Sequence, residues 1–366
     1  SEICLTMSMQ NRVSEVVNPF SLARLNQLLQ GMKRIAICCH ARPDGDAIGS
    51  SLGLGNLLTT LGYEVLCVAP NRAPAHIAWP EGAKDLLYNF EEEGADVKPF
   101  LASCDLLFCL DFNALSRLDE PMMLFVESLA VPRVMIDHHP HPSSQFDLYF
   151  SMPESSSTCE LLTELLLANW GQAAISQKVA IPLYMGLMTD TGSFSYSCSR
   201  KRTFEIAGIL VEQGVDVPEV QARVYNSRTL DSLMLQSALI LQYTTFFAGK
   251  AGKEKAAIVQ LSQPVQEQYQ YQPGDTEGLA NLPLCVGSVQ VSVLLTERSN
   301  GTVRVSARST KRYTVNKLLA QFFNGGGHPQ ASGGTLRMPL HDAYEYTRRV
   351  LSQFLEKEAQ QEEEVL

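Results

Sequence analysis

The sequence predicts an α/β protein with two domains, and three observations support this prediction. The chain has 366 residues, which is long for a single hydrophobic core. Over residues 1–200, short apolar runs alternate with longer helical segments, a pattern that indicates βαβ units and a mostly parallel sheet. Towards the C-terminus the pattern changes to alternating strands followed by a helix, which predicts a smaller α/β domain with a mixed sheet.

The domain limits follow from these changes in pattern. We expect an N-terminal parallel-sheet domain over residues 1–200, a helical linker over 201–235 and a C-terminal domain over 236–366, with a cleft between the two domains. The helices expected in the linker, at 203–213 and 218–225, are alternatively the last helices of the first domain.

In the first domain, strands are expected where short apolar runs lie between polar turns. They fall at residues 35–39, 63–69, 105–111 and 133–139. Helices are expected at 21–31, 52–58 and 159–170, the last capped by Ser157 or Thr158. The apolar segment 180–192 is more typical of a helix than of a strand.

The second domain is expected to begin with two strands separated by a turn at Gly249 and Lys250, and to continue with a hairpin across Asn300 and Gly301. These four strands are expected at 243–248, 255–261, 289–296 and 302–307. A helix at 315–323, a glycine-rich segment at 325–334 and an amphipathic helix from 341 to about 356 follow.

Composition and charge narrow the classes of function. Hydrophobic residues make up 45% of the chain and charged residues 19%, which is typical of a soluble globular protein. No apolar segment approaches the ~20 residues of a membrane-spanning helix, so no membrane association is expected. The net charge of -10 disfavours a general binder of long duplex nucleic acid, which would need a broad basic face. Short anionic substrates held by metals and a few cations remain compatible with this charge.

The cysteines and the N-terminal segment favour a cytoplasmic location. The chain has nine cysteines, most of them in apolar runs and none in a CxxC pair, as expected of buried thiols in a reducing compartment. Residues 1–18 lack the basic, apolar and small-residue order of a signal peptide.

A loop that follows the first expected strand carries one imidazole and two carboxylates, those of His40, Asp44 and Asp46. Pro43 and Gly45 turn the chain here. In open α/β sheets, ligands bind at the carboxyl ends of the strands, and these nitrogen and oxygen donors suit manganese, magnesium or zinc. Taken alone, the two aspartates would be better explained as turn and helix-cap residues, and a metal site is favoured only because acids end three further apolar segments.

Three further apolar segments end in an acid, at Asp111, at Asp137 and at Asp190. Because the carboxyl ends of parallel strands lie at one edge of a sheet, we expect these ends to converge with the first loop. Crowded carboxylates repel one another unless cations lie between them, and two divalent metals would supply those cations. The expected ligands are His40, Asp44, Asp46, Asp111, His138 and Asp190.

These four motifs, in this order, resemble those of the DHH phosphoesterase superfamily, which includes RecJ-type nucleases, manganese-dependent inorganic pyrophosphatases and small-oligonucleotide phosphodiesterases. The resemblance implies two divalent metal ions, for which the carboxylate-rich set favours manganese over zinc, with magnesium as an alternative. The implied ligands are His40, Asp44 and Asp190 for one metal, Asp46 and His138 for the other, and Asp111 as the bridge.

The resemblance also implies a catalytic role for His139 beside that of Asp111. His139 would face the substrate phosphate and help to neutralise or protonate the leaving oxygen, whereas the alternative is a hydrogen-bonded histidine with no chemical role. Asp137 would orient a histidine ring.

In the second half, residues Gly325, Gly326, Gly327 and His328 resemble the signature of the DHH-associated C-terminal domain. Unhindered backbone N–H groups can cradle an anion, and His328 can donate to it. We expect Gly326, Gly327 and His328 to bind a terminal phosphate of the substrate. Arg308 is the expected phosphate clamp, because a guanidinium is always charged and binds oxygens in pairs.

The two halves together resemble NrnA-type enzymes, which pair hydrolysis of short oligoribonucleotides with removal of the 3′-phosphate from pAp. The implied function is that of a metal-dependent phosphodiesterase or exonuclease acting on very short single-stranded RNA or on linear dinucleotides such as pApA and pGpG, and also on pAp. The alternative is a manganese-dependent pyrophosphatase or exopolyphosphatase, which would share the metal centre but need a more cationic second domain. Apolar edge strands are compatible with a homodimer.

Overall fold

The computed structural model describes residues 16–248 and 254–365. The chain divides into two compact units, Ser1–Ser227 and Arg228–Leu366, and each is described here by itself. Most of the segment 1–18 and the turn expected at Gly249 and Lys250 lie outside the described residues.

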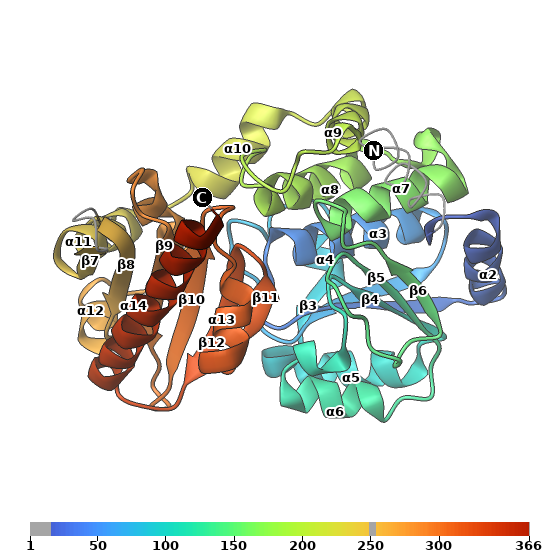
Figure 1. The fold of residues 1–366 in the computed structure, drawn as a ribbon. Helices are drawn as coiled ribbons and strands as arrows, with labels where there is room; N and C mark the ends of the chain where they lie inside the picture. The colour runs from blue at the N-terminus through green and yellow to red at the C-terminus, as the bar shows by residue number, and fades with distance from the viewer. Residues whose placement is uncertain (1–15, 249–253, 366) are drawn as a thin grey trace. The chain divides into compact units, whose positions relative to one another are not determined.

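The first unit is built on a six-stranded parallel sheet with the order β3-β2-β1-β4-β5-β6 (Figure 1). The strands are β1 Arg34–Cys39, β2 Glu64–Ala69, β3 Leu87–Asn89, β4 Leu106–Leu110, β5 Arg133–Asp137 and β6 Leu148–Ser151. The predicted parallel sheet is therefore confirmed, and β3 and β6 are edge strands that the sequence analysis did not predict. The strand order reverses between β1 and β4, and ligands of open α/β sheets bind at such a point.

Helices cover both faces of this sheet, and the side chains of β1 are therefore buried on both sides in alternation. Ile35 and Ile37 pack under α2, α3, α7 and α8, whereas Ala36 and Cys38 pack against α5 and α6 (Figure 1). The helices are α2 Pro19–Leu29, α3 Gly45–Thr60, α4 Ala83–Leu86, α5 Phe90–Ser103, α6 Glu120–Glu127, α7 Thr158–Trp170, α8 Gln177–Asp190, α9 Lys201–Glu212 and α10 Val217–Tyr225, with short 3₁₀ turns at Leu115–Arg117 and Gln172–Ala174.

The segment expected to be a linker forms three helices. Side chains of α9 and α10 belong to the same core as α3 and α8, whereas the next helix, α11 (Leu230–Gln242), lies in the second unit. The domain limits expected at residues 200 and 235 stay predictions.

Helices α3 and α8 pack with their backbones close together. Glycines recur every four residues along α3, and a Cβ atom at Gly49 would lie 2.3 Å from the carbonyl oxygen of Pro182 and 3.0 Å from the nitrogen of Gly186. A Cβ atom at Gly186 would in turn lie 3.0 Å from the carbonyl oxygen of Gly45. Only glycine allows this approach, which brings the first turn of α3 beside the last turn of α8.

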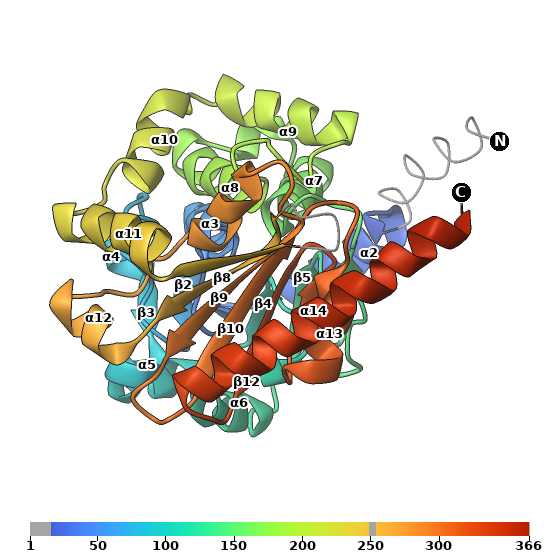
Figure 2. The ribbon, with the colours of Figure 1, turned by 60° about the vertical axis from the view of Figure 1, so that its left-hand side comes forward.

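The second unit contains a six-stranded mixed sheet with the order β11-β12-β10-β9-β8-β7, in which only the β8–β9 pair is parallel. On one face lie α11, α12 and a 3₁₀ segment, and on the other lie α13 and α14 (Figure 2). The elements are β7 Thr244–Ala248, β8 Glu254–Leu261, α12 Gln263–Gln268, the 3₁₀ segment Leu279–Cys285, β9 Val291–Glu297, β10 Val303–Ser309, α13 Val315–Phe322, β11 Gly326–His328, β12 Ala331–Leu336 and α14 Leu340–Val365. The predicted mixed sheet is confirmed.

The glycine-rich segment is a β-hairpin, which the sequence analysis did not predict. A Cβ atom at Gly325 would lie 2.0 Å from the carbonyl oxygen of Gly333, and one at Gly327, whose φ is +138°, would lie 2.8 Å from that of Ala331. A Cβ atom at Gly326 would meet nothing within 4 Å. The hairpin itself therefore requires glycine at 325 and 327 but leaves position 326 open.

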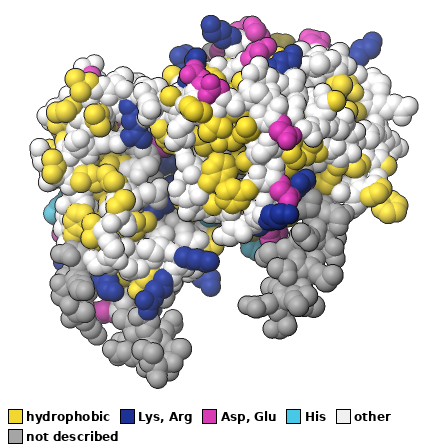
Figure 3. Space-filling view, turned by 90° about the horizontal axis from the view of Figure 1, so that it is seen from above, with side chains coloured by type: hydrophobic (Ala, Val, Ile, Leu, Met, Phe, Trp, Pro, Cys, Tyr) yellow, Lys and Arg dark blue, Asp and Glu magenta, His cyan; other side chains and the backbone are white. Residues whose placement is uncertain are grey.

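The surface mixes both signs of charge with apolar side chains. The face in Figure 3 carries Lys and Arg as well as Asp and Glu, with hydrophobic side chains gathered in patches between them. Within the described residues, no helix combines the length and the apolar character needed to cross a bilayer.

The space around each glycine predicts opposite effects on stability for two alanine substitutions, one in the α3–α8 contact and one outside it. Gly49→Ala places a Cβ against backbone atoms and should lower the free energy of unfolding by about 1–3 kcal/mol, as overpacking does. Gly208→Ala, on the exposed side of α9 with nothing within 4 Å, should raise it by about 0.4–1 kcal/mol. Urea denaturation of both variants checks this, and a Gly49→Ala protein as stable as the parent would contradict the packing described.

Candidate metal centre

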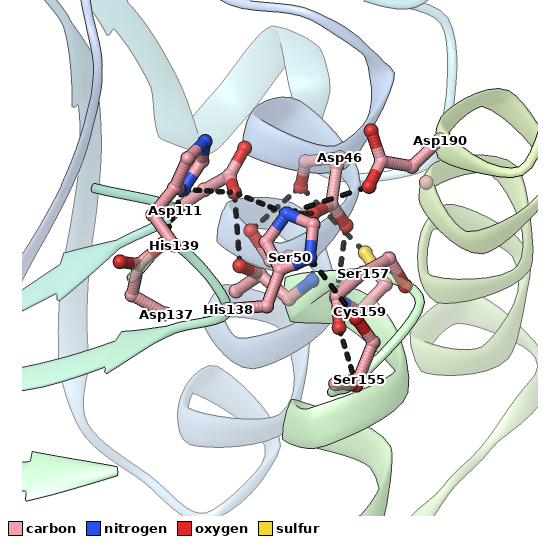
Figure 4. Close-up of polar contacts among 12 residues, drawn as sticks. Asp46, Ser50, Asp111, Asp137, His138, His139, Ser155, Ser157, Cys159 and Asp190 are labelled. Atoms are coloured by element: carbon pink, nitrogen blue, oxygen red, sulfur yellow. Dashed lines mark hydrogen bonds and ion pairs between the residues drawn. The ribbon is translucent and has the colours of Figure 1, made fainter. Parts of the chain in front are cut away.

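The metal ligands expected from the sequence converge at one edge of the first sheet (Figure 4). His40 follows β1 and Asp111 follows β4, the two strands between which the order reverses. His138 follows β5, and Asp190 is the last residue of α8. Asp111 has a φ of +64°, a left-handed conformation that bends the chain away from β4 and that aspartate adopts more readily than most residues.

Both carboxylates of the first loop belong to α3. Asp44 caps this helix, and its side chain accepts from the backbone N–H groups of Asp46 and Ala47 at 3.1 and 3.0 Å. Asp46 lies in the first turn and is 1% exposed. The helix-cap role considered for Asp44 is therefore present, and the cap still leaves its other oxygen, Oδ2, 3.7 Å from Nε2 of His40.

The donor atoms form two groups, in each of which they lie within 4.8 Å of one another. The first group contains His40, Asp44 and Asp111, and the second contains Asp46, His138 and Asp190. The sequence analysis placed Asp190 with His40 and Asp44, whereas here its carboxylate lies in the group of Asp46 and His138, so the sharing of ligands between two ions stays a prediction. Because α8 runs along α3, the Asp190 carboxylate reaches the side of Asp46, and its Oδ2 lies 3.4 Å from Nε2 of His138.

Asp111 lies between the two groups. Its Oδ2 is 3.3 Å from Nε2 of His40, and its Oδ1 is 3.6 Å from Nε2 of His138. One oxygen therefore faces each group, which is the arrangement that a bridging carboxylate requires.

Contacts to the backbone fix the rings of the two ligand histidines. Nδ1 of His40 donates to the carbonyl oxygen of the next residue, Ala41, at 2.9 Å. Nδ1 of His138 donates to the carbonyl oxygen of Ser155 at 3.2 Å. With Nδ1 as the donor, Nε2 faces the carboxylates and is the nitrogen that would bind a metal ion after losing its proton.

His139 is held differently. Its Nδ1 lies 2.7 Å from Oδ1 of Asp137, a residue with no exposed surface. This contact orients the His139 ring, as expected of Asp137. The ring is partly exposed, at 17%, whereas those of His40 and His138 are buried.

The turn at the start of α7, residues 155–159, makes contacts that the sequence analysis missed. The backbone N–H groups of Thr158 and Cys159 donate to the two oxygens of Asp46 at 2.7 and 2.8 Å. The Thr158 hydroxyl donates to Oδ1 of Asp111 at 2.9 Å. The only signal in the sequence was the expected cap, since Ser157 does cap α7 by accepting from the N–H of Glu160.

The crowding shifts the pKa values of the cluster. Burial, together with the charges of Asp111 and Asp190, raises the pKa of Asp46 well above its usual range. Burial raises the pKa of Asp190 to about 7. Burial opposes charge on His138, but the carboxylates of Asp190, Asp46 and Asp111 outweigh it and raise the pKa of this ring to about 10.

This donor set fits divalent metal ions. Carboxylate oxygens and imidazole nitrogens are donors that manganese and magnesium accept, and none of the residues in the two groups offers a soft thiolate. Without metal ions, the carboxylates of the cluster are neutralised by protons on themselves and on the histidines. Divalent cations placed between them would neutralise the same charge.

The residues expected to bind phosphate lie together in the second unit. Arg308 on β10 and His328 on β11 both pair with Ala331 of β12, which lies between them. Residues in one register row of an antiparallel sheet share a face, so Arg308 and His328 point to the same side. Gly326 and Gly327 precede His328 on the same strand.

Comparison with known proteins agrees with these two units. Residues 34–187 match the model of the DHH family N-terminal domain, and residues 253–357 match that of the DHHA1 domain.

Two relatives are named bifunctional oligoribonuclease and PAP phosphatase NrnA, in the first case as probable. One, from Streptococcus mutans, is 30% identical over 82% of this chain and 88% of its own, and the other, from Thermus thermophilus, is 31% identical over 85% and 87%. The crystal structure of an exopolyphosphatase-related protein from Bacteroides fragilis is 32% identical, with a TM-score of 0.85 over 93% of this chain and 97% of that one. This chain therefore belongs to the DHH family of phosphoesterases.

Proposed function

We propose that this chain is a metal-dependent phosphodiesterase that releases mononucleotides from very short single-stranded RNA and from linear dinucleotides such as pApA and pGpG, and that it also removes the 3′-phosphate from pAp. The position of Asp111, with one oxygen towards each of two donor groups, carries this proposal. The names of the Streptococcus and Thermus relatives support the substrate class.

We assign two divalent metal ions to the centre, manganese in the first place and magnesium as the alternative. His40 and Asp44 would hold one ion, and the group of Asp46, His138 and Asp190 the other, with Asp111 shared. Such ions, when bound, lower the pKa of water and neutralise charge on a phosphoryl group.

His139 would act on the leaving group. Asp137 accepts from Nδ1 and fixes the ring, so Nε2 is the nitrogen from which a proton would pass to the departing sugar oxygen. A charged His139 would also stabilise the added negative charge on phosphorus.

Arg308 and His328 would bind the terminal phosphate of the substrate. Their shared face on the second sheet presents a guanidinium and an imidazole, both of which donate to phosphate oxygens. The open space beside Gly326 and the close backbone packing of Gly327 support approach of an anion to this strand. Recognition of a terminal phosphate would favour very short substrates.

A second candidate function uses the same centre. The Bacteroides protein is described as exopolyphosphatase-related, which favours a pyrophosphatase or exopolyphosphatase as the alternative. Both reactions break a phosphorus–oxygen bond, so only the substrate distinguishes them.

The cellular setting stays a proposal as well. The eight cysteines among the described residues are all free thiols, which supports a reducing cytoplasm. The homodimer expected from the apolar edge strands stays a prediction.

Hydrolysis of a substrate panel with manganese tests the function. We expect mononucleotides from pApA, pGpG and a five-residue RNA, phosphate from pAp, and little product from a twenty-residue single strand or from pyrophosphate. Asp111→Ala should reduce every activity to background, because both donor groups lose a shared carboxylate. Rapid phosphate release from pyrophosphate with untouched dinucleotides would keep the metal chemistry and overturn the substrate class.

The role of His328 is tested with a pair of substrates. His328→Ala should raise KM for pApA by about 10- to 150-fold, since a hydrogen bond to a charged group contributes about 1.5–3 kcal/mol, and should leave KM for ApA, without the 5′-phosphate, unchanged. His341→Ala, an exposed histidine at the start of α14, is the matched control. Equal effects of His328→Ala on both dinucleotides would exclude a phosphate contact.

Manganese should stabilise the protein more at pH 8 than at pH 6. Without metal, both Asp190 and His138 have raised pKa values, so their contributions to stability fall as the pH rises. The contribution of Asp190 falls between about pH 4 and 7, and that of His138 between about pH 6.5 and 10. Metal must displace these protons, so its apparent affinity rises with pH. Thermal unfolding with MnCl₂ or EDTA measures the gain, about 2.7 kcal/mol per ion at a hundredfold excess over Kd. An equal gain at both pH values would contradict the assignment.

A further inference from the structure

One short turn contacts metal ligands that come from three different elements. The turn, residues 155–159, includes the first two residues of α7, and its polar atoms reach Asp46 of α3, Asp111 after β4 and His138 after β5 (Figure 4). Of these contacts, those to Asp46 and His138 use backbone atoms, which nearly any residue type would supply. The contact to Asp111 uses the hydroxyl of Thr158, which depends on the residue type.

The Thr158 hydroxyl acts on one particular oxygen of Asp111. It donates to Oδ1, the oxygen on the side of His138, whereas Oδ2 lies on the side of His40. Thr158 has no exposed surface and Asp111 is 2% exposed, so no bulk solvent competes for this bond. Rotation of the carboxylate about its last bond would break the contact, and the hydroxyl therefore fixes the carboxylate in the orientation that directs one oxygen to each donor group.

The turn is held in place by contacts that do not involve the ligands. The Ser155 hydroxyl donates to the carbonyl oxygen of Ser157 at 2.9 Å. The buried carboxylate of Glu160, in the first turn of α7, accepts from the hydroxyl of Thr203 at 2.7 Å and from Arg200 at 2.9 Å. Because Glu160 also accepts from the backbone N–H of Ser156, these bonds tie the turn to the start of α9, and the protein sets the position of Thr158 without an ion.

We propose that Thr158 is a positioning residue of the metal centre, which orients Asp111 so that this carboxylate serves both ions. This inference rests on the proposed two-metal centre. Without the hydroxyl, the carboxylate could rotate towards one group, and one of the two ions would lose a ligand.

Three variants separate this role from a purely structural one. Thr158→Val keeps the shape and the backbone N–H bond to Asp46 but removes the hydroxyl, and Thr158→Ser restores the hydroxyl. Thr163→Val is the matched control, because Thr163 is a fully buried threonine of the same helix whose hydroxyl donates only to the carbonyl oxygen of Cys159. Thr158→Ala replaces Thr158→Val if valine prevents folding.

The experiment is a titration of each metal-free protein with Mn²⁺, followed by calorimetry and by electron paramagnetic resonance of the unbound ion. We expect the parent protein to bind two ions and Thr158→Val to bind the weaker one about 10- to 100-fold less tightly, the usual effect of removing a contact to a metal ligand. Thr158→Ser and Thr163→Val should bind as the parent does. Excess Mn²⁺ should restore kcat of Thr158→Val with pApA while KM for pApA stays unchanged.

The outcomes distinguish this inference from the proposal on which it rests. A parent protein that binds fewer than two ions overturns the two-metal centre, and the role of Thr158 with it. Two ions bound equally well by the parent and by Thr158→Val overturn the role of Thr158 alone. Equal losses in Thr158→Val and Thr163→Val would assign the effect to packing of α7 and would also overturn it.

Discussion

The first unit depends on the burial of negative charge at one edge of its sheet. Asp46 and Asp111 are almost completely buried, and Asp190 lies beside them. A buried carboxylate without partners is strongly destabilising, so each of these groups has to be met by a cation or a hydrogen-bond donor. The protein supplies imidazoles, two backbone N–H groups and a hydroxyl, and the remaining excess of negative charge is what divalent ions would balance.

Backbone packing determines whether this charge can be gathered at all. Asp46 and Asp190 belong to helices that approach so closely that only glycine fits at Gly49 and Gly186. A larger residue at either position would separate the first turn of α3 from the last turn of α8. The fold and the chemistry therefore share one requirement, the α3–α8 contact, and this explains why a stripe of glycines runs through a helix that needs none for its own stability.

Much of this arrangement could be predicted from the sequence, because the rules that govern it are local. Short apolar runs between turns identified β1, β2, β4 and β5, and the parallel topology then brought their carboxyl ends to one edge. Prediction failed where tertiary contacts decide. β3 and β6 are short edge strands of three and four residues, and β12 contains two glycines that disfavour strands in isolation. The contacts of Thr158 were missed for the same reason.

At several positions one residue has a structural role and is also proposed to have a chemical one. Asp44 caps α3 with one oxygen while the other faces His40. Gly327 is required by the hairpin and is also proposed to admit an anion. Ser157 caps α7, and that cap places the N–H groups that bind Asp46. A residue that fixes the local backbone is already rigid, and a metal centre needs ligands that are held rigidly. The structural role of such a residue is therefore compatible with its proposed role in binding.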